Sequence, residues 1–145
     1  KIVGNVFDEN FNKLFINKIS KLKNIIYLGP LYGKKKFAEL NKADVLVFPT
    51  KYPNEAFPLV ILEAMSLGVP AISSTEGAIP DIIDHNRNGF LLKKNNATKC
   101  AKFMMKYLNF RNLSNIHGDR AKKKHTKNFT FEIFEKKLID FIKKV

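Results

Sequence analysis

The segment over residues 54–68, NEAFPLVILEAMSLG, restricts the possible folds of this chain more than any other part of its sequence. Its periodicity predicts a helix over residues 58–67 that is apolar on almost every side, and Pro58 suits the first helical position, where a missing N–H costs nothing. Such a helix packs against a sheet and is not left in water. Glu63 lies in its middle, and burying a carboxylate without partners costs several kcal/mol. We therefore expect hydrogen-bond donors around Glu63.

A second carboxylate, Glu55, comes just before this predicted helix. At the helix start the backbone N–H groups of Leu59 and Val60 have no acceptor within the helix, and that end of a helix attracts phosphate. Carboxylates on either side can accept hydrogen bonds from hydroxyl groups. This combination is typical of a nucleotide-sugar site.

Short apolar runs alternate with helical patterns along the chain. The pattern predicts strands at residues 1–4, 25–28, 45–48, 69–73 and 90–92. It predicts helices at residues 11–23, 34–43, 58–67, 79–83, 97–109, 114–124 and 130–144. This alternation indicates an α/β fold, a Rossmann-like parallel sheet with helices on both faces. Ligands bind such sheets at the carboxyl ends of the strands, where the loop over residues 49–57 leads into the apolar helix.

The length of 145 residues suits one domain over residues 1–145, with enough chain for a hydrophobic core. Cys100 is the only cysteine, so no intrachain disulfide can form, and we expect a reducing, cytoplasmic location. No signal peptide or membrane-spanning run is apparent. The chain starts at Lys1 with a strand-like segment, so we expect a fragment of a longer protein.

The net charge of +13 comes mostly from scattered lysines. It leaves three interpretations open: a solvated basic surface, contact with the inner face of an anionic membrane, or nucleic-acid binding. The chain has only three arginines, Arg87, Arg111 and Arg120, although base readers and phosphate clamps favour arginine. We therefore expect no nucleic-acid partner and leave a peripheral membrane contact open.

Metal, hydride-transfer and serine-hydrolase chemistry lack the residues that they need. The histidines His85, His117 and His125 are dispersed in polar surroundings, so we expect surface histidines and no metal site. The sequence has no Gly-x-Gly-x-x-Gly and no Gly-x-Ser-x-Gly motif.

The last predicted helix has a broad apolar face, and Thr130 is placed to cap its start. We expect this face to pack against the rest of the chain. It is formed by Phe131, Phe134, Leu138, Phe141 and Ile142.

Residues 44–92 carry an ordered series of motifs. Glu55 and Glu63 form a Glu-x7-Glu pair, and the second glutamate begins the triplet Glu-Ala-Met. The other motifs are Pro49-Thr50, Gly68-Val69-Pro70, Glu76-Gly77-Ala78 and Asn88-Gly89. In this order the segment closely resembles the C-terminal, donor-binding half of retaining glycosyltransferases with the GT-B fold, in the large family four, also called glycosyl transferases group 1.

The resemblance implies a role for each matching residue. Glu63 would bind the two ribose hydroxyls of the nucleotide. Glu55, the candidate catalytic residue, would contact hydroxyls of the donor sugar or stabilise positive charge near the anomeric carbon. Pro58 has no amide and would only shape the turn, and Gly77 is interpreted as a turn residue. The remaining donor-binding residues would act through their backbone: Phe57, Leu59 and Val60 at the sugar-diphosphate, and Leu31 around the base.

The implied reaction transfers a sugar from a nucleoside diphosphate to an acceptor hydroxyl, with retention of the anomeric configuration. The resemblance implies no metal and no other cofactor; the helix start and an earlier loop with an Arg and a Lys would stabilise the leaving diphosphate. That loop, and the N-terminal domain that would bind a glycan or lipid-linked acceptor, are expected to precede Lys1. We therefore expect little or no transferase activity from this chain alone. A catalytically inactive nucleotide-binding relative and a basic membrane-docking module are the alternatives.

Overall fold

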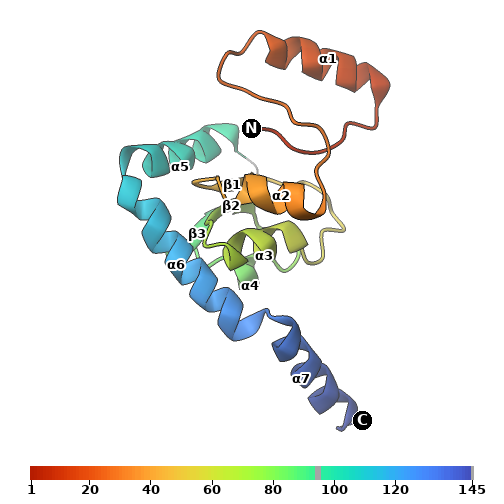
Figure 1. Ribbon diagram of the computed structural model, residues 1–145, viewed down its shortest axis with the longest axis vertical. Helices are drawn as coiled ribbons and strands as arrows, with labels where there is room; N and C mark the ends of the chain where they lie inside the picture. Colours follow the sequence, from red (N-terminus) through yellow and green to blue (C-terminus); the bar gives the residue numbers. More distant parts are fainter. Residues whose placement is uncertain (94–95, 145) are drawn as a thin grey trace. The chain divides into compact units, whose positions relative to one another are not determined.

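The computed structural model describes residues 1–93 and 96–144 (Figure 1). The chain divides into two compact units, Lys1–Glu39 and Leu40–Val145. Of the candidate site residues, Leu31 belongs to the first unit and all others belong to the second. The assignment of the whole chain to one nucleotide-sugar-binding domain stays a prediction.

The first unit contains helix α1 (Glu9–Ser20) and nearly all of α2 (Gly33–Leu40). α1 begins earlier than its periodicity predicted because the Asp8 carboxylate accepts a hydrogen bond from the Phe11 N–H and caps the helix. The strands predicted at residues 1–4 and 25–28 pair in parallel, but only as a single bridge between Ile2 and Tyr27. Among the described residues of this unit neither segment has a further strand beside it, and an isolated pair of strands is marginally stable.

The second unit contains a sheet of three parallel strands in the order β1-β2-β3 (Figure 1). The strands are β1 (Leu46–Phe48), β2 (Ala71–Ser74) and β3 (Gly89–Leu92). The connecting helices are α3 (Leu59–Ser66) between β1 and β2 and α4 (Ile79–Ile82) between β2 and β3. After β3 come α5 (Ala97–Asn109), α6 (Arg111–Asn128) and α7 (Phe131–Ile142). The α/β order agrees with the sequence pattern.

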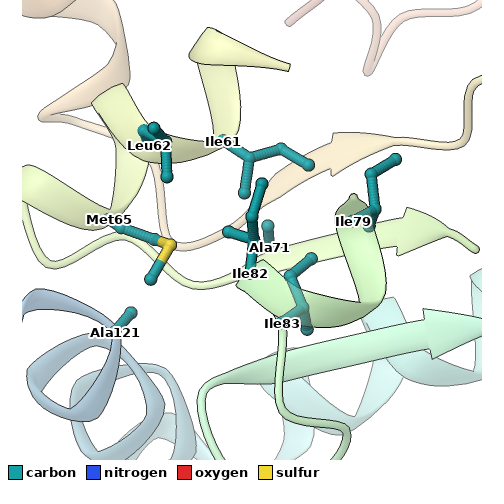
Figure 2. Packing of buried hydrophobic residues seen from close by; sticks show 8 residues of the cluster. All are labelled: Ile61, Leu62, Met65, Ala71, Ile79, Ile82, Ile83 and Ala121. Atoms are coloured by element: carbon teal, nitrogen blue, oxygen red, sulfur yellow. The ribbon is translucent and has the colours of Figure 1, made fainter. Parts of the chain in front are cut away.

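Apolar side chains cover both faces of the sheet. Figure 2 shows the cluster on one face, which α3, α4 and α6 share with β2; its buried residues are Ile61, Leu62, Met65, Ala71, Ile79, Ile82, Ile83 and Ala121. On the other face, Phe103 and Tyr107 of α5 pack on Ile72, Phe90 and Leu92. Neighbouring residues Ala71 and Ile72 point to opposite clusters, as alternation along a strand requires. The predicted Rossmann-like sheet with helices on both faces is confirmed.

Helix α6 approaches the end of α3 closely because both backbones carry glycine there. Gly68 ends α3 with φ of +76°, a conformation that glycine adopts without strain. A Cβ atom on Gly118 of α6 would lie 2.0 Å from the Gly68 carbonyl oxygen. Any side chain at position 118 would therefore push α6 away from α3.

His117 is buried, which contradicts the expectation of a surface histidine. Its side chain is 2% exposed, and its Nδ1 shares a hydrogen bond of 2.9 Å with the Tyr107 hydroxyl. Burial and the Arg120 charge lower the pKa of His117, against a backbone hydrogen bond with Asn86 that raises it. Burial raises the pKa of Tyr107. The two side chains thus form a neutral polar pair beside Phe90, made by a helix packing that local spacing does not reveal.

Helix α7 starts as expected, because the Thr130 hydroxyl accepts a hydrogen bond from the Ile133 N–H at 3.4 Å. The expectation that its apolar face is packed is wrong for the described residues: none of its residues is buried, and Phe131, Phe134 and Phe141 are exposed. Within residues 1–93 and 96–144, no helix has both the length and the apolar character that crossing a membrane requires.

Candidate functional site

The carboxyl ends of the three strands define the candidate site. Phe48 pairs with Ser73 at the end of β1, and Ser74 pairs with Leu92 at the ends of β2 and β3. Because the strands are parallel, the loops that follow them leave from the same edge of the sheet. Two of these loops, residues 49–58 and 75–78, contain or contact the predicted site residues. Ligands bind parallel sheets at this edge.

The loop after β1 is a series of turns that ends at Glu55. The Thr50 N–H donates to the Phe48 carbonyl at 2.9 Å, and the Tyr52 N–H donates to the Thr50 hydroxyl oxygen at 3.1 Å. The Glu55 N–H then donates to the Tyr52 carbonyl at 3.1 Å. These bonds give the half-buried Glu55 a defined backbone position just before α3.

The loop after β2, a later segment of the chain, also contacts the backbone at Glu55. Gly77 adopts φ of +50°, and a Cβ atom there would lie 1.7 Å from the Glu55 carbonyl oxygen. The next residue, Ala78, donates its N–H to the Ala56 carbonyl at 3.0 Å. Gly77 is therefore more than a turn residue, because its missing side chain lets the two loops touch. The sequence showed a glycine after a strand but not the segment that lies against it.

The start of α3 offers backbone N–H groups to an anion. Pro58 is the residue before the helix and not its first residue, with φ −73° and ψ 104°, and its side chain caps nothing. The amides of Leu59 and Val60 consequently have no acceptor inside the helix. The first turn holds no acidic residue, so no carboxylate of the helix competes with a bound anion. The Leu59 side chain is 66% exposed, whereas Pro58 is buried and anchors the turn.

Glu63 occupies the position in α3 that the sequence predicted. Its side chain is half-buried, and the carboxylate oxygen Oε2 is fully buried. Ile61, Leu62, Ala64 and Met65 on either side of it face the core. A carboxylate of this kind is not a solvent-exposed helix residue.

Phe57 lies directly before the helix, and its ring is fixed from one side. Its ring centroid is 6.1 Å from that of Phe129, in an edge-to-face arrangement. Phe129 in turn packs against the core cluster of Figure 2. The contact holds the backbone at Phe57, the predicted phosphate-binding amide, next to the start of α3.

Ser74 is a polar residue at this edge that the sequence did not single out. It is the last residue of β2 and is 2% exposed, and its Oγ has no hydrogen-bond partner among the described residues. A buried hydroxyl without a partner costs free energy. Only the strand end made by folding distinguishes Ser74 from the other serines of the chain.

The remaining predictions for the site are not decided by this arrangement. Leu31 is half-buried in the first unit, and its role around the base stays a prediction. Across the described residues, no three His, Cys, Asp or Glu side chains gather as metal ligands do.

The sequence matches the model of the family described as glycosyl transferases group 1 over residues 1–124. Sulfoquinovosyl transferase SQD2 of Arabidopsis thaliana is 30% identical over 124 residues, which cover 83% of this chain and 23% of that protein. An uncharacterized 41.2 kDa protein in the cps region of Klebsiella pneumoniae is 29% identical over 136 residues, covering 94% of this chain and 35% of that protein. The chain thus spans about a third or less of the length of these curated relatives.

Solved structures show the same fold. Anabaena Alr3699/HepE in complex with UDP matches with a TM-score of 0.87 at 19% identity, covering 99% of this chain and 40% of that chain. The C-terminal domain of a glycosyl transferase group 1 family protein (LpcC) from Francisella tularensis matches with a TM-score of 0.72 at 23% identity, covering 86% of this chain and 65% of that one. The fold is therefore that of the C-terminal half of a GT-B glycosyltransferase. With the family match over residues 1–124, the chain belongs to the glycosyl transferases group 1.

Proposed function

We propose that the second unit is the donor-binding part of a retaining glycosyltransferase, which moves a sugar from a nucleoside diphosphate to an acceptor hydroxyl. The observation that carries the proposal is the start of α3, whose uncapped amides lie between Glu55 before the helix and Glu63 within it. The HepE structures support a nucleotide-sugar ligand, because that protein was solved with UDP and with UDP-glucose.

The sugar-diphosphate would meet the amides of Phe57, Leu59 and Val60. Negative charge grows on the diphosphate as the bond to the sugar breaks, and fixed N–H dipoles stabilise growing charge without having to reorganise. The acid-free first turn of α3 favours this charge. Pro58 contributes no donor and sets the direction in which the loop enters the helix. Our proposal includes no metal and no other cofactor for this step.

The two glutamates would bind opposite ends of the donor. Glu63 has two carboxylate oxygens, which can accept hydrogen bonds from the two neighbouring ribose hydroxyls. Glu55 would contact the sugar hydroxyls or stabilise positive charge near the anomeric carbon. The contact of Gly77 with the Glu55 backbone would hold this residue at a fixed position relative to the amides of α3.

Acceptor binding would require protein beyond these 145 residues. The curated relatives extend well beyond the part that this chain matches. We therefore propose that a glycan or lipid-linked acceptor binds to another part of a longer protein, in the cytoplasm or at the inner face of a membrane. The isolated chain would bind nucleotide weakly and transfer little or no sugar.

Isothermal titration calorimetry of the chain with UDP, GDP and ADP tests the proposal. One of these nucleotides should bind, and its 2′-deoxyribose form should bind more weakly. Glu63→Gln should weaken ribonucleotide binding by about tenfold or more, because a hydrogen bond to a charged group contributes roughly 1.5–3 kcal/mol. Its affinity for the deoxyribose form should change less.

Glu135→Gln is the matched control, because it makes the same chemical change at an exposed position of α7. It should leave nucleotide affinity unchanged. Equal affinity of the unaltered chain for ribo- and deoxyribonucleotides would refute the role of Glu63. Appreciable sugar transfer by the chain alone would refute the proposed need for a further domain.

A further inference from the structure

Helices α5 and α6 meet at a bend, and Phe110 is the residue between them (Figure 1). Its φ of −119° and ψ of 79° continue neither helix. Its N–H donates to the Lys106 carbonyl at 3.0 Å, and its carbonyl accepts from the Leu113 N–H at 2.8 Å. These bonds fix Lys106 before the bend and Leu113 after it, each about one turn away. The Phe110 ring is left 65% exposed.

The turn before β3 lies beside the same part of α6. The Asn86 N–H donates to the carbonyl of Gly89, the first residue of β3, at 2.8 Å. A hydrogen bond also joins the Asn86 backbone to the His117 side chain of α6. This region therefore lies at the amino ends of the strands, whereas the candidate donor site lies at their carboxyl ends.

A hollow with a volume of about 410 Å³ lies between the bend and this turn. Three apolar side chains, two carboxamides and one ammonium group surround it, and small-molecule sites usually combine these kinds of groups in about 300–1,000 Å³. We call it the α5–α6 hollow, and it is lined by Asn86, Lys106, Phe110, Asn112, Leu113 and Ile116. Its apolar part is open to solvent, since Ile116 is 46% exposed in addition to Phe110. Exposed apolar side chains gathered in one place indicate an interaction site.

Lys106 is the only charged residue among the described ones that line the hollow. Within residues 1–93 and 96–144, its ammonium group forms no ion pair. It lies 5.3 Å from the centroid of the Phe90 ring and 5.8 Å from that of Phe103. The sequence has no Asp or Glu between Asp84 and Asp119. The hollow thus contains a positive charge that its own segment does not balance.

The surroundings of Lys106 show the same imbalance. Asp84, at one end of the acid-free stretch, already pairs with Lys124 at 2.9 Å. The pKa of His85 is lowered by burial and then by the charges of Lys99 and Lys106. A negative group that enters the hollow would meet an uncompensated cation next to apolar surface.

We propose that the α5–α6 hollow binds a small organic carboxylate with an apolar body, at a site separate from the donor site. The Lys106 ammonium donates to the carboxylate, and the two carboxamides of the hollow have N–H groups for its second oxygen. The apolar body lies on the three apolar side chains. One ammonium matches one negative charge, whereas a phosphate dianion favours several cations or an arginine fork.

Other occupants fit the hollow less well. A nucleic acid is held by many cations along its backbone, and the described lining of the hollow has one. A second copy of the chain that docked symmetrically through the same hollow would bring the two Lys106 charges together.

Titration of the chain with hydrocinnamate, followed by NMR, tests the inference. This probe has an aromatic ring, a short alkyl chain and one carboxylate. It should shift the backbone amide signals around Phe110. It should also bind about tenfold more tightly than the neutral hydrocinnamyl alcohol, which lacks the charge-assisted hydrogen bond. Acetate, which has no apolar body, should bind more weakly than hydrocinnamate.

Two variants separate the charge from the apolar lining. Lys106→Gln should weaken hydrocinnamate binding about tenfold and leave the affinity for the alcohol unchanged. Phe110→Ala should weaken both ligands by the same factor, roughly fivefold.

Matched controls make the same chemical changes outside the hollow. Lys102→Gln removes a charge one turn earlier on α5, and Phe141→Ala removes a ring on α7 that is 66% exposed. Neither should change the affinity for hydrocinnamate. All four substituted side chains are exposed, so circular dichroism should be unchanged in every variant.

Three outcomes would overturn the inference. The first is no binding of hydrocinnamate, or no preference for it over the alcohol. The second is an equal loss of affinity for Lys106→Gln and Lys102→Gln. The third is displacement of hydrocinnamate by UDP, which would place the acid in the donor site. The titration itself uses no nucleotide, so a failure of the proposed donor function would leave this test intact.

Discussion

Replacing Gly77 by alanine should reduce the free energy of unfolding by at least about 2 kcal/mol. Alanine at φ of +50° costs about 1 kcal/mol in backbone strain alone. The added Cβ would lie 1.7 Å from the Glu55 carbonyl oxygen and 2.9 Å from that of Ala56, so one of the two loops must move. Moving it breaks the 3.0 Å hydrogen bond from Ala78 to Ala56, which contributes about 1 kcal/mol, and loosens the packing around it.

Two other glycines separate the cost of backbone strain from the cost of a steric clash. Gly68 has φ of +76°, but a Cβ there would meet its nearest atom, the Gly118 carbonyl oxygen, at 3.8 Å. Gly68→Ala should therefore cost only the backbone strain, about 1 kcal/mol. Gly118 is inside α6, where alanine gains about 1 kcal/mol in helix propensity, but its Cβ would lie 2.0 Å from the Gly68 carbonyl oxygen. Gly118→Ala should still destabilise the chain, because backbone and not a flexible side chain is in the way.

Urea unfolding followed by circular dichroism measures these three variants, and calorimetry measures their nucleotide affinity. Gly77→Ala should be the least stable of the three and should also lose nucleotide affinity, because the displaced loop carries Glu55 and leads to the amides of α3. Gly68→Ala should keep its affinity. A Gly77→Ala variant that is as stable as Gly68→Ala would refute the reasoning from the contact at Glu55.

The other predictions concern the core and the loop before α3. Stability should fall as pH drops below about 6.5, because the unfolded chain then binds protons that the lowered pKa of His117 keeps off the folded one. In urea titrations between about pH 7.5 and 5, the free energy of unfolding of His117→Gln should depend less on pH than that of the unaltered chain. An unchanged pH dependence would contradict the role of His117. Tyr107→Phe should cost about 1–3 kcal/mol by leaving the buried His117 nitrogen without its partner, measured by the same titration at neutral pH. Ala121→Leu should cost about 1–3 kcal/mol, since Ala121 is fully buried against α3, and its thermal midpoint should fall accordingly. Phe57→Ala should weaken nucleotide binding in calorimetry, because Phe57 holds the loop against Phe129. It should change the thermal midpoint little, because Phe57 is exposed.

Much of the second unit could be predicted from local patterns. The helix over residues 97–109 has the predicted bounds, since Asn96 caps its first turn and its apolar residues recur at helical spacing. The strands at 46–48, 71–74 and 89–92 lie within two residues of their predicted positions. The carboxylates Glu55 and Glu63 also lie at the expected places, before the apolar helix and within it.

The errors involve contacts between residues far apart in the sequence. His117 looked like a surface residue because its polar neighbours on α6 concealed its packing on Phe90. The segments at residues 1–4 and 25–28 have strand-like composition, but a strand also needs neighbours to pair with, and composition does not supply them. The apolar face of α7 has helical periodicity, yet periodicity does not say which surface covers it.

Local periodicity and the order of the motifs were thus sufficient for the α/β architecture, the apolar helix α3 and the two glutamates that frame its start. These properties depend on neighbours within one turn or one strand, which a linear sequence displays. Folding alone brought Gly77 against Glu55, buried His117 with Tyr107, and left the Ser74 hydroxyl enclosed. Each of these follows from two segments meeting across the sheet or between helices, and their distance in space is not encoded in their spacing along the chain.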